Sequence, residues 1–326
     1  MAKLRVAADK QTNFRAPSPR LLLRRHQGLR GYLLLSPTLA LMAAMMAAPL
    51  AALVILSFWT QQNFDIDVTP GLRNYRHLFE PSKDVTYWFG IPFPLAHPVY
   101  AILLVKSVLM SLAVTMAVIV AAYPMAYFLA FRVQRHKKAW LILITVPLWT
   151  SYLLRVFAWK IVLGYNGAIN SGLISLGVLK KPLAFLLYDP LAVIITLTHA
   201  WAAFAILPIY VSLEKIDRSL LEAATDLGDT AWQRFRRVTL PLSAPGTIAA
   251  ALLVFIPTVG DYVTPALVGG TGGTMIGNEI QSLFGRQSDA PLGAAVSVVM
   301  MAAVTLLVCL FLWGVGYRTM RSRGRL

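Results

Sequence analysis

The sequence predicts an all-α polytopic membrane protein with six transmembrane helices, and three observations support this fold class. Hydrophobic residues make up 57% of the 326 residues and charged residues only 13%, whereas a soluble domain needs more polar surface to cover its core. The apolar residues gather in long segments, each close to the ~20 residues that a bilayer-spanning helix needs. The lysines and arginines are concentrated between these segments.

Six apolar segments are the predicted spans. They cover residues 33–58, 107–131, 139–163, 191–213, 244–266 and 292–317. The first follows a basic stretch and therefore resembles a secretory signal peptide. Its apolar run is longer than the roughly 7–15 residues of a signal-peptide hydrophobic region. We therefore interpret it as a retained first span.

The distribution of lysine and arginine predicts the orientation of these spans. Twenty-one of them lie in the N-terminal tail, the loops after spans two and four, and the C-terminal tail, against six on the opposite face. Positively charged loops face the cytoplasm, so both termini are predicted to be cytoplasmic. The predicted organisation is a basic cytoplasmic tail (1–32), a transmembrane domain (33–317) and a second basic tail (318–326). Within the domain, 60–99 is expected to be periplasmic and 214–242 to be a cytoplasmic loop.

Other function classes are disfavoured by composition and motifs. The net charge of +16 sits in short segments between apolar runs, which is typical of contact with lipid headgroups and not of a nucleic-acid-binding domain. The single cysteine, Cys309, offers neither an internal disulfide nor a metal cluster. The sequence contains no P-loop, no zinc-protease motif and no nucleophile-elbow motif. We therefore predict that the chain has no catalytic residues and no metal site, and is not an enzyme.

The loop between spans four and five is predicted to contain two short helices. Ser219 and Glu222 have the spacing of a capping box at the start of the first helix, and Gly228 is expected to end it. Thr230 and Gln233 have the same spacing at the start of the second.

That second helix is predicted to end at Val238, before Pro241. Ser243 is then expected to cap span five, with Pro245 in its first turn. Because helices this short are marginal in isolation, the element is expected to dock against the protein's own spans or against a partner.

The same loop carries a resemblance to a known family, the permease subunits of binding-protein-dependent ABC importers. The matching residues are Glu222, Ala223 and Ala224, then Gly228, then Val238, Thr239, Leu240 and Pro241. They are similar to the family's signature loop, which fits into a groove on the ATPase subunit. The resemblance implies a type I importer fold and ATPase-coupling roles for Glu222, Ala223, Ala224, Gly228, Leu240 and Pro241. Glu222 and Gly228 also have a purely structural interpretation, as a helix cap and a helix stop.

Further stretches resemble the spermidine/putrescine-type permeases. They are 123–127, 147–159, 207–210 and 255–265. One difference is that many relatives have Glu at the position of Asp261, so the charge is kept on a side chain one methylene shorter.

The resemblance also implies the partners and the reaction cycle. A second permease subunit, expected to be a different chain, would form the path together with this one in a bacterial inner membrane. Two ATPase subunits would bind ATP and magnesium, so no cofactor is expected in this chain. A periplasmic solute-binding protein would deliver a small polar solute, expected to be a polyamine or related amine. An opine, an amino-acid derivative or a phosphonate remains an alternative, as does a homodimer.

Ionisable residues inside the predicted spans are candidates for the substrate path. Helix rise places Arg155 and Asp261 roughly 24 Å, and His199 roughly 22 Å, above the cytoplasmic ends of their spans. Pro257 and Gly260 are predicted to break span five beside Asp261, as is typical of helices that line a cavity. The equally weighted alternative is a structural ion pair between Arg155 and Asp261.

Aromatic and basic residues near this level have two interpretations. Trp149, Tyr152 and Tyr262 are candidates for stacking on a substrate amine, or they are packing and membrane-interface residues. Lys106 and Lys160 lie near span ends, where long side chains extend to the headgroups.

Two other functions are alternatives for the whole chain. An ion-coupled secondary transporter would use Asp261 as its coupling carboxylate, but it would not need the Glu222–Gly228 loop. A membrane scaffold would not need ionisable residues within its spans.

Overall fold

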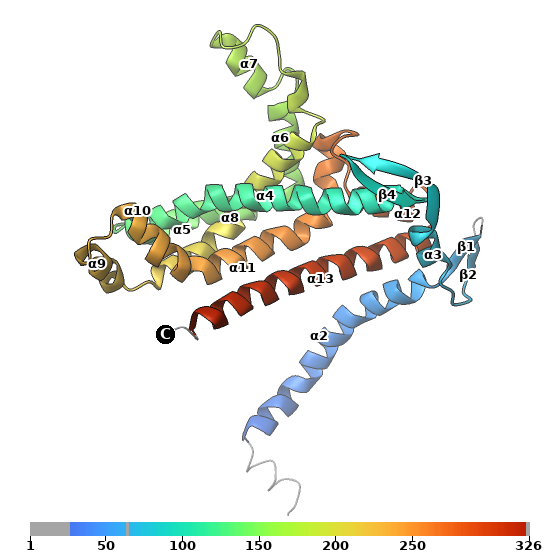
Figure 1. Cartoon of the computed structure of the whole chain (residues 1–326), viewed down its shortest axis with the longest axis horizontal. Coiled ribbons are helices and arrows are strands. Elements are labelled where there is room, and N and C mark those ends of the chain that lie inside the picture. The colour runs from blue at the N-terminus through green and yellow to red at the C-terminus, as the bar shows by residue number, and fades with distance from the viewer. Residues whose placement is uncertain (1–26, 63–64, 324–326) are drawn as a thin grey trace, which may run out of the picture. The chain divides into compact units, whose positions relative to one another are not determined.

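A computed structural model describes residues 27–62 and 65–323 (Figure 1). The chain divides into two units, Met1–Ile55 and Leu56–Leu326. The predicted basic N-terminal tail lies outside the described residues up to residue 26.

Helix α2 (Gln27–Ser57) accounts for the described part of the first unit. Its segment Leu34–Ser57 is long and apolar enough to cross a membrane. Two prolines, Pro37 and Pro49, lie inside this helix. The first predicted span is therefore a helix, and it begins several residues earlier than expected.

Residues 60–99, the segment predicted to be periplasmic, contain all the strands of the described part of the chain. The segment forms β1 (Thr60–Gln62), β2 (Asp65–Asp67), α3 (Arg73–Phe79), β3 (Pro81–Trp88) and β4 (Ile91–Leu95). The strands make two antiparallel hairpins, β1–β2 and β3–β4. Phe89 and Gly90, which connect β3 to β4, both have positive φ, the backbone of a tight hairpin turn. The fold is helical in its bulk, with these two small hairpins added.

Three helices form the packed centre of the second unit. They are α4 (Pro98–Phe131), α8 (Pro190–Glu214) and α11 (Leu240–Val259). A Cβ on Gly246 of α11 would lie 2.3 Å from the Ser212 Cβ of α8, so only glycine permits this approach. The buried hydroxyls of Tyr123 and Ser243 are 2.7 Å apart and connect α4 to α11.

The third predicted span is broken, and the expectation of one continuous helix over 139–163 is wrong. Its parts are α5 (Lys137–Thr145), η1 (Val146–Trp149) and α6 (Tyr152–Leu163), followed by α7 (Ala168–Ser175). The two halves are bent by 86°. Thr150 and Ser151 have extended backbone directly after a proline-containing 3₁₀ turn, which ends the hydrogen-bond ladder. The height assigned to Arg155 by counting residues along one helix therefore does not hold.

The fifth predicted span begins earlier than expected, because the helix that contains it extends back into the preceding loop. Helix α10 (Ala231–Arg234) continues through the π-helical turn η3 (Phe235–Thr239) into α11 without a stop at Pro241. Ser243 and Pro245 lie inside α11 and neither caps it. The wider π turn lacks the regular i→i−4 bonds that proline would interrupt.

The chain ends in three further elements. They are η4 (Pro265–Gly269), α12 (Ile276–Phe284) and α13 (Ala290–Arg323); a short turn, η2 (Ala184–Leu186), lies earlier. The predicted C-terminal tail from residue 318 is helical as far as Arg323. In the described residues five helices are long and apolar enough to span a membrane, or six when the bent pair counts as one span.

Candidate functional site

The first part of the candidate site is the α9–α10 loop, where α9 covers Arg218–Asp226. Asp217 caps α9, and its side chain accepts a hydrogen bond from the Ser219 N–H at 3.0 Å. Hydrogen bonds from Ser219 lower the pKa of the Asp217 carboxyl. The predicted Ser219–Glu222 capping box is therefore wrong, since the cap lies two residues earlier.

The end of α9 depends on Gly228. Its φ of +89° is a left-handed conformation that suits glycine. The Gly228 N–H donates to the Thr225 carbonyl, and the Asp229 N–H donates to the Ala224 carbonyl. These two bonds form a Schellman motif, so the predicted glycine stop is confirmed.

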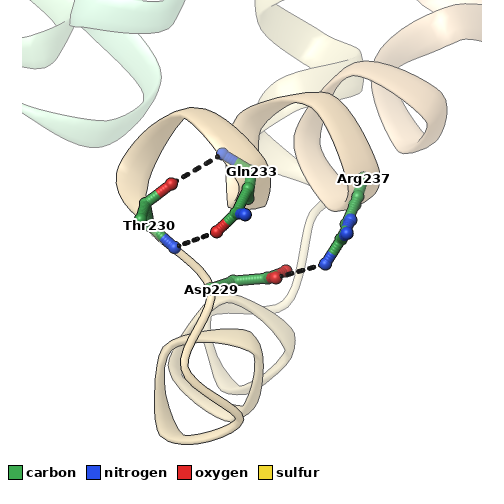
Figure 2. Close-up of polar contacts among 4 residues, drawn as sticks. All are labelled: Asp229, Thr230, Gln233 and Arg237. Atoms are coloured by element: carbon green, nitrogen blue, oxygen red, sulfur yellow. Dashed lines mark hydrogen bonds and ion pairs between the residues drawn. The ribbon is translucent and has the colours of Figure 1, made fainter.

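Helix α10 begins with the predicted capping box (Figure 2). The Gln233 N–H donates to the Thr230 hydroxyl at 3.3 Å, and the Thr230 N–H donates to the Gln233 amide oxygen at 2.8 Å. Figure 2 also shows Arg237 donating to the Asp229 carboxylate, at 2.6 Å. The turn between α9 and α10 is thus held on both sides by short-range polar contacts.

Exposure divides the residues of this loop into two groups. Glu222 and Ala223 are exposed on α9; Leu227 is 88% and Trp232 is 68% exposed. Ala224 is buried, so its contribution is packing within the chain. The apolar residues of α9 and of its C-terminal end therefore divide between a face buried in the chain and a face exposed to solvent.

The other leucines of α9 and the last two residues of the signature motif divide in the same way. Leu221 packs against the core, while Leu220 is 48% exposed. Leu240 and Pro241, at the start of α11, are both exposed.

Aromatic contacts connect the loop to the bundle. Phe235, in the π turn, contacts the rings of Tyr123 and Tyr127 of α4 at centroid distances of 5.7 and 6.3 Å. On its other side it stacks on Trp232 at 5.5 Å. Sequence reasoning missed Phe235 because its partners on α4 lie more than a hundred residues away.

The second part of the candidate site surrounds Asp261. One carboxylate oxygen accepts from the Val263 N–H at 2.9 Å and the Thr264 N–H at 3.4 Å. The other accepts a short hydrogen bond from the Tyr152 hydroxyl. That hydroxyl also lies 2.5 Å from the Thr264 hydroxyl. Asp261 and Tyr152, predicted separately, are therefore in contact, and Thr264 is a third member that the sequence did not reveal.

Arg155 extends this network toward α8. Its guanidinium donates to the Ala200 carbonyl at 2.9 Å and lies 6.0 Å from the centre of the Tyr152 ring. Its Nε is buried and has no hydrogen-bond partner among the described residues. Among those residues no ion pair joins Arg155 to Asp261, whose carboxylate accepts from the Tyr152 hydroxyl. The alternative of a direct structural ion pair therefore has no support in the geometry.

The other predicted path residues are all exposed. His199, next to Ala200, is exposed and contacts the ring of Trp159 at 5.4 Å. Trp149 is 81% and Tyr262 is 47% exposed.

The two residues predicted to break span five, which are also candidates for a hinge there, differ from each other. Pro257 lies inside α11, whereas Gly260 is the residue at which that helix ends. The predicted break beside Asp261 is therefore at Gly260 alone.

The side chains of Asp261, Tyr152 and Arg155 form a group that can bind a polar solute. A carboxylate, a phenol and a guanidinium gather in an otherwise apolar bundle. Such a set can attract a polar solute and hold it by hydrogen bonds.

Sequence comparison identifies the family. Residues 172–318 match the family described as "Binding-protein-dependent transport system inner membrane component". The spermidine/putrescine transport system permease protein PotB of Escherichia coli (strain K12) is 39% identical over 217 residues, which cover 67% of this chain and 78% of PotB. PotB of Haemophilus influenzae is 36% identical over 236 residues, 71% of this chain and 82% of that protein.

A longer alignment and a solved structure agree with this result. The inner membrane ABC transporter permease protein YdcU of Escherichia coli (strain K12) is 32% identical over 292 residues, 86% of this chain and 88% of YdcU. The structure of a bacterial ABC transporter involved in alginate import superposes with a TM-score of 0.61 at 19% identity, covering 91% of this chain and 97% of that one. The chain therefore belongs to the inner-membrane components of binding-protein-dependent transport systems, and is a multi-pass permease subunit of an ABC importer, not an enzyme.

Proposed function

We propose that this subunit carries a polyamine, or a closely related organic amine, into the cytoplasm. The observation that carries the substrate class is the 36–39% identity to spermidine/putrescine permeases over two thirds or more of the chain. The Asp261 carboxylate adds chemical support, because it places a negative charge where a cationic amine would pass.

The proposed orientation places both termini and the α9–α10 loop in the cytoplasm. The excess of lysine and arginine on that face supports this orientation. Within Leu56–Leu326, Figure 1 shows α9 and α10 at one end of the helices and the β3–β4 hairpin with α3 at the other. The hairpins would then face the periplasm.

The α9–α10 loop is proposed to dock on an ATPase subunit. Glu222 and Ala223 would contact the ATPase, while Gly228 would keep the two helices at their angle. Leu240 and Pro241 stand where η3 joins α11, so displacement of the loop would pull on α11 directly. ATP and magnesium would bind to the ATPase subunits and no cofactor to this chain.

The polar network is proposed to line the translocation path. Its proposed members are Asp261, Tyr152, Arg155, His199, Trp149 and Tyr262. The exposed rings of Trp149 and Tyr262 can stack on an ammonium group. Movement at the Gly260 break, with Pro257 in the turn before it, would change how Asp261 faces the path.

The proposed assembly contains two different permease subunits, two ATPase subunits and a periplasmic solute-binding protein. Closure of the ATPases on ATP would push the docked loops and open the path outward. Hydrolysis would return it to the inward-facing state. This is alternating access, driven by the different affinities of the two states for nucleotide.

The experiment is uptake of radiolabelled spermidine, putrescine and a neutral sugar into proteoliposomes that contain the whole transporter and its binding protein. Glu222→Ala is compared with Glu279→Ala, which removes a glutamate of α12 outside the loop. We expect uptake of the polyamines alone to require ATP. Glu222→Ala should reduce uptake and Glu279→Ala should not, with both complexes assembling normally.

Three results would contradict the proposal. Uptake driven by an ion gradient without ATP would make the chain a secondary transporter. Equal effects of the two glutamate variants would remove the docking role of the loop. Transport of the sugar but not of the polyamines would reject the substrate class.

A further inference from the structure

A cluster of two histidines and a glutamate lies at the base of the β3–β4 hairpin, apart from both regions of the candidate site. His77 is in the last turn of α3, Glu80 follows that helix, and His97 precedes α4. Their possible ligand atoms all lie within 4.8 Å of one another. The two imidazole rings are 3.8 Å apart between centroids, with an interplanar angle of 33°.

Backbone contacts hold the two ends of this cluster together. The Ala96 N–H donates to the Glu80 carbonyl at 2.8 Å, and Pro81 pairs with Leu95 at the open end of the hairpin. His97 is therefore kept close to Glu80 although the residues between them form a complete hairpin.

Helix α3 is itself fixed in place. The buried Asn74 side chain donates to the Ser57 carbonyl at 3.1 Å and to the Trp59 carbonyl at 2.7 Å. Leu78 is buried in a core cluster with Ile276 and Leu283. The helix thus holds His77 next to the first residues of α4 before any ligand binds.

We propose that His77, Glu80 and His97 form a binding site for a divalent transition-metal ion, with zinc the best match. Two imidazole nitrogens and one carboxylate oxygen are a zinc ligand set that leaves a fourth position for water. With metal–nitrogen bonds of about 2.1 Å, tetrahedral ligands lie roughly 3.4 Å apart, so the three side chains have to close by up to roughly 1.4 Å. Hard cations such as magnesium and calcium prefer oxygen ligands and fit this set poorly.

An open cavity of about 900 Å³ gives the cluster access to solvent. His77 and Glu80 line it together with Asp289, and so do Arg73 and Arg76. The Asp289 carboxylate favours a cation, while the two guanidinium groups oppose one. Because these charges oppose one another, we expect the site to bind a metal ion with moderate affinity and to exchange it with solvent.

The bound ion would connect α3, the end of the hairpin and the start of α4 through one centre. The hairpin would then move less relative to these two helices. This inference rests on the geometry of the cluster and does not depend on the substrate or direction of transport.

The test uses the full chain within its transporter complex, purified without a histidine tag and stripped with EDTA. Zinc binding is measured by competition with a chromophoric chelator, and cobalt is added separately to report ligand type through its visible absorption. We expect one zinc site of moderate affinity per copy of this chain. His77→Gln and His97→Gln should each weaken it by at least about tenfold, and Glu80→Gln by a smaller factor. His136→Gln, which removes an exposed histidine outside the cluster, is the control.

Amide hydrogen exchange over residues 81–96 is the second readout. Zinc should slow exchange there in the wild type and in His136→Gln, but not in His97→Gln. The proposal fails if no zinc binds, if the control weakens binding as much as the cluster variants do, or if zinc leaves exchange in the hairpin unchanged.

Discussion

The α9–α10 loop and the Asp261 network are both polar, yet they are held in opposite ways. In the loop, the side-chain hydrogen bonds among the described residues join partners no more than nine positions apart, as in Thr230–Gln233 and Asp229–Arg237. In the network, Tyr152 reaches Asp261 across 109 positions and Arg155 reaches Ala200 across 45. The loop is therefore a preformed part that can move as a unit, whereas the network exists only while the helices keep their packing.

The largest expected loss of transport follows from a substitution in the Asp261 network. Asp261→Ala removes the acceptor of the Val263 and Thr264 N–H groups and leaves the Tyr152 hydroxyl with the Thr264 hydroxyl as its remaining partner. Each buried group left unpaired costs ~1–3 kcal/mol. We expect uptake in proteoliposomes to fall by at least about tenfold. Asp67→Ala is the matched control, because Asp67 also accepts from a backbone N–H and a hydroxyl of Thr69, but in an exposed hairpin. Uptake by Asp261→Ala equal to that of the control would mean that the network does not serve transport.

The next largest effect is expected for Gly228→Ala, which tests whether the α9–α10 loop moves as a unit. Gly228→Ala places a side chain at φ +89°, where it strains the backbone by about 1–2 kcal/mol. A Cβ at Gly228 meets no atom within 4 Å, and neither does one at Gly177, which has φ +72°. Gly177→Ala therefore has the same strain without altering the loop.

We expect Gly228→Ala to lower ATP-dependent uptake several-fold, and Gly177→Ala to leave uptake near the wild-type value. Stimulation of the ATPase by the binding protein is the second measurement. If the two alanine variants behave alike, the angle between α9 and α10 does not matter for coupling.

A smaller effect is expected at the start of α10. Thr230→Ala removes one half of the capping box and should destabilise the first turn by ~1 kcal/mol. Hydrogen exchange over residues 231–234 measures this loss. In a double-mutant cycle with Gln233→Ala, the second change should add little, because the two contacts depend on each other. Fully additive effects would show that the two halves of the box act independently.

The smallest effect is expected at Asp217. Asn keeps an acceptor for the Ser219 N–H, so Asp217→Asn should change exchange at the start of α9 less than Asp217→Ala does. The pKa of this carboxyl is lowered from its ordinary value of 3.8, so its stabilising charge is present above that value. That contribution is lost as pH falls through the lowered pKa. Equal exchange in the two variants would contradict the capping role of Asp217.

The sequence by itself determined the membrane class, the family and the local chemistry of the loop. Long apolar runs need no tertiary contact to be recognised. The Gly228 stop and the Thr230–Gln233 box were also predictable, because their partners lie within a few residues. The errors nearby have local causes as well: Asp217, two positions before Ser219, is the better cap, and the π turn at Phe235–Thr239 lets the helix continue past Pro241.

Only the tertiary structure decided what the intramembrane residues do to one another. Counting the helix rise assumed a straight third span, but the chain bends by 86° at its middle, and that bend lets Tyr152 stand between Arg155 and Asp261. The contacts of Thr264 with Tyr152 and of Phe235 with α4, and the approach of His97 to His77, depend likewise on which helices pack together. A sequence pattern reports spacing along one element, whereas the meeting of side chains from different elements depends on the rotation and crossing of helices, which packing decides.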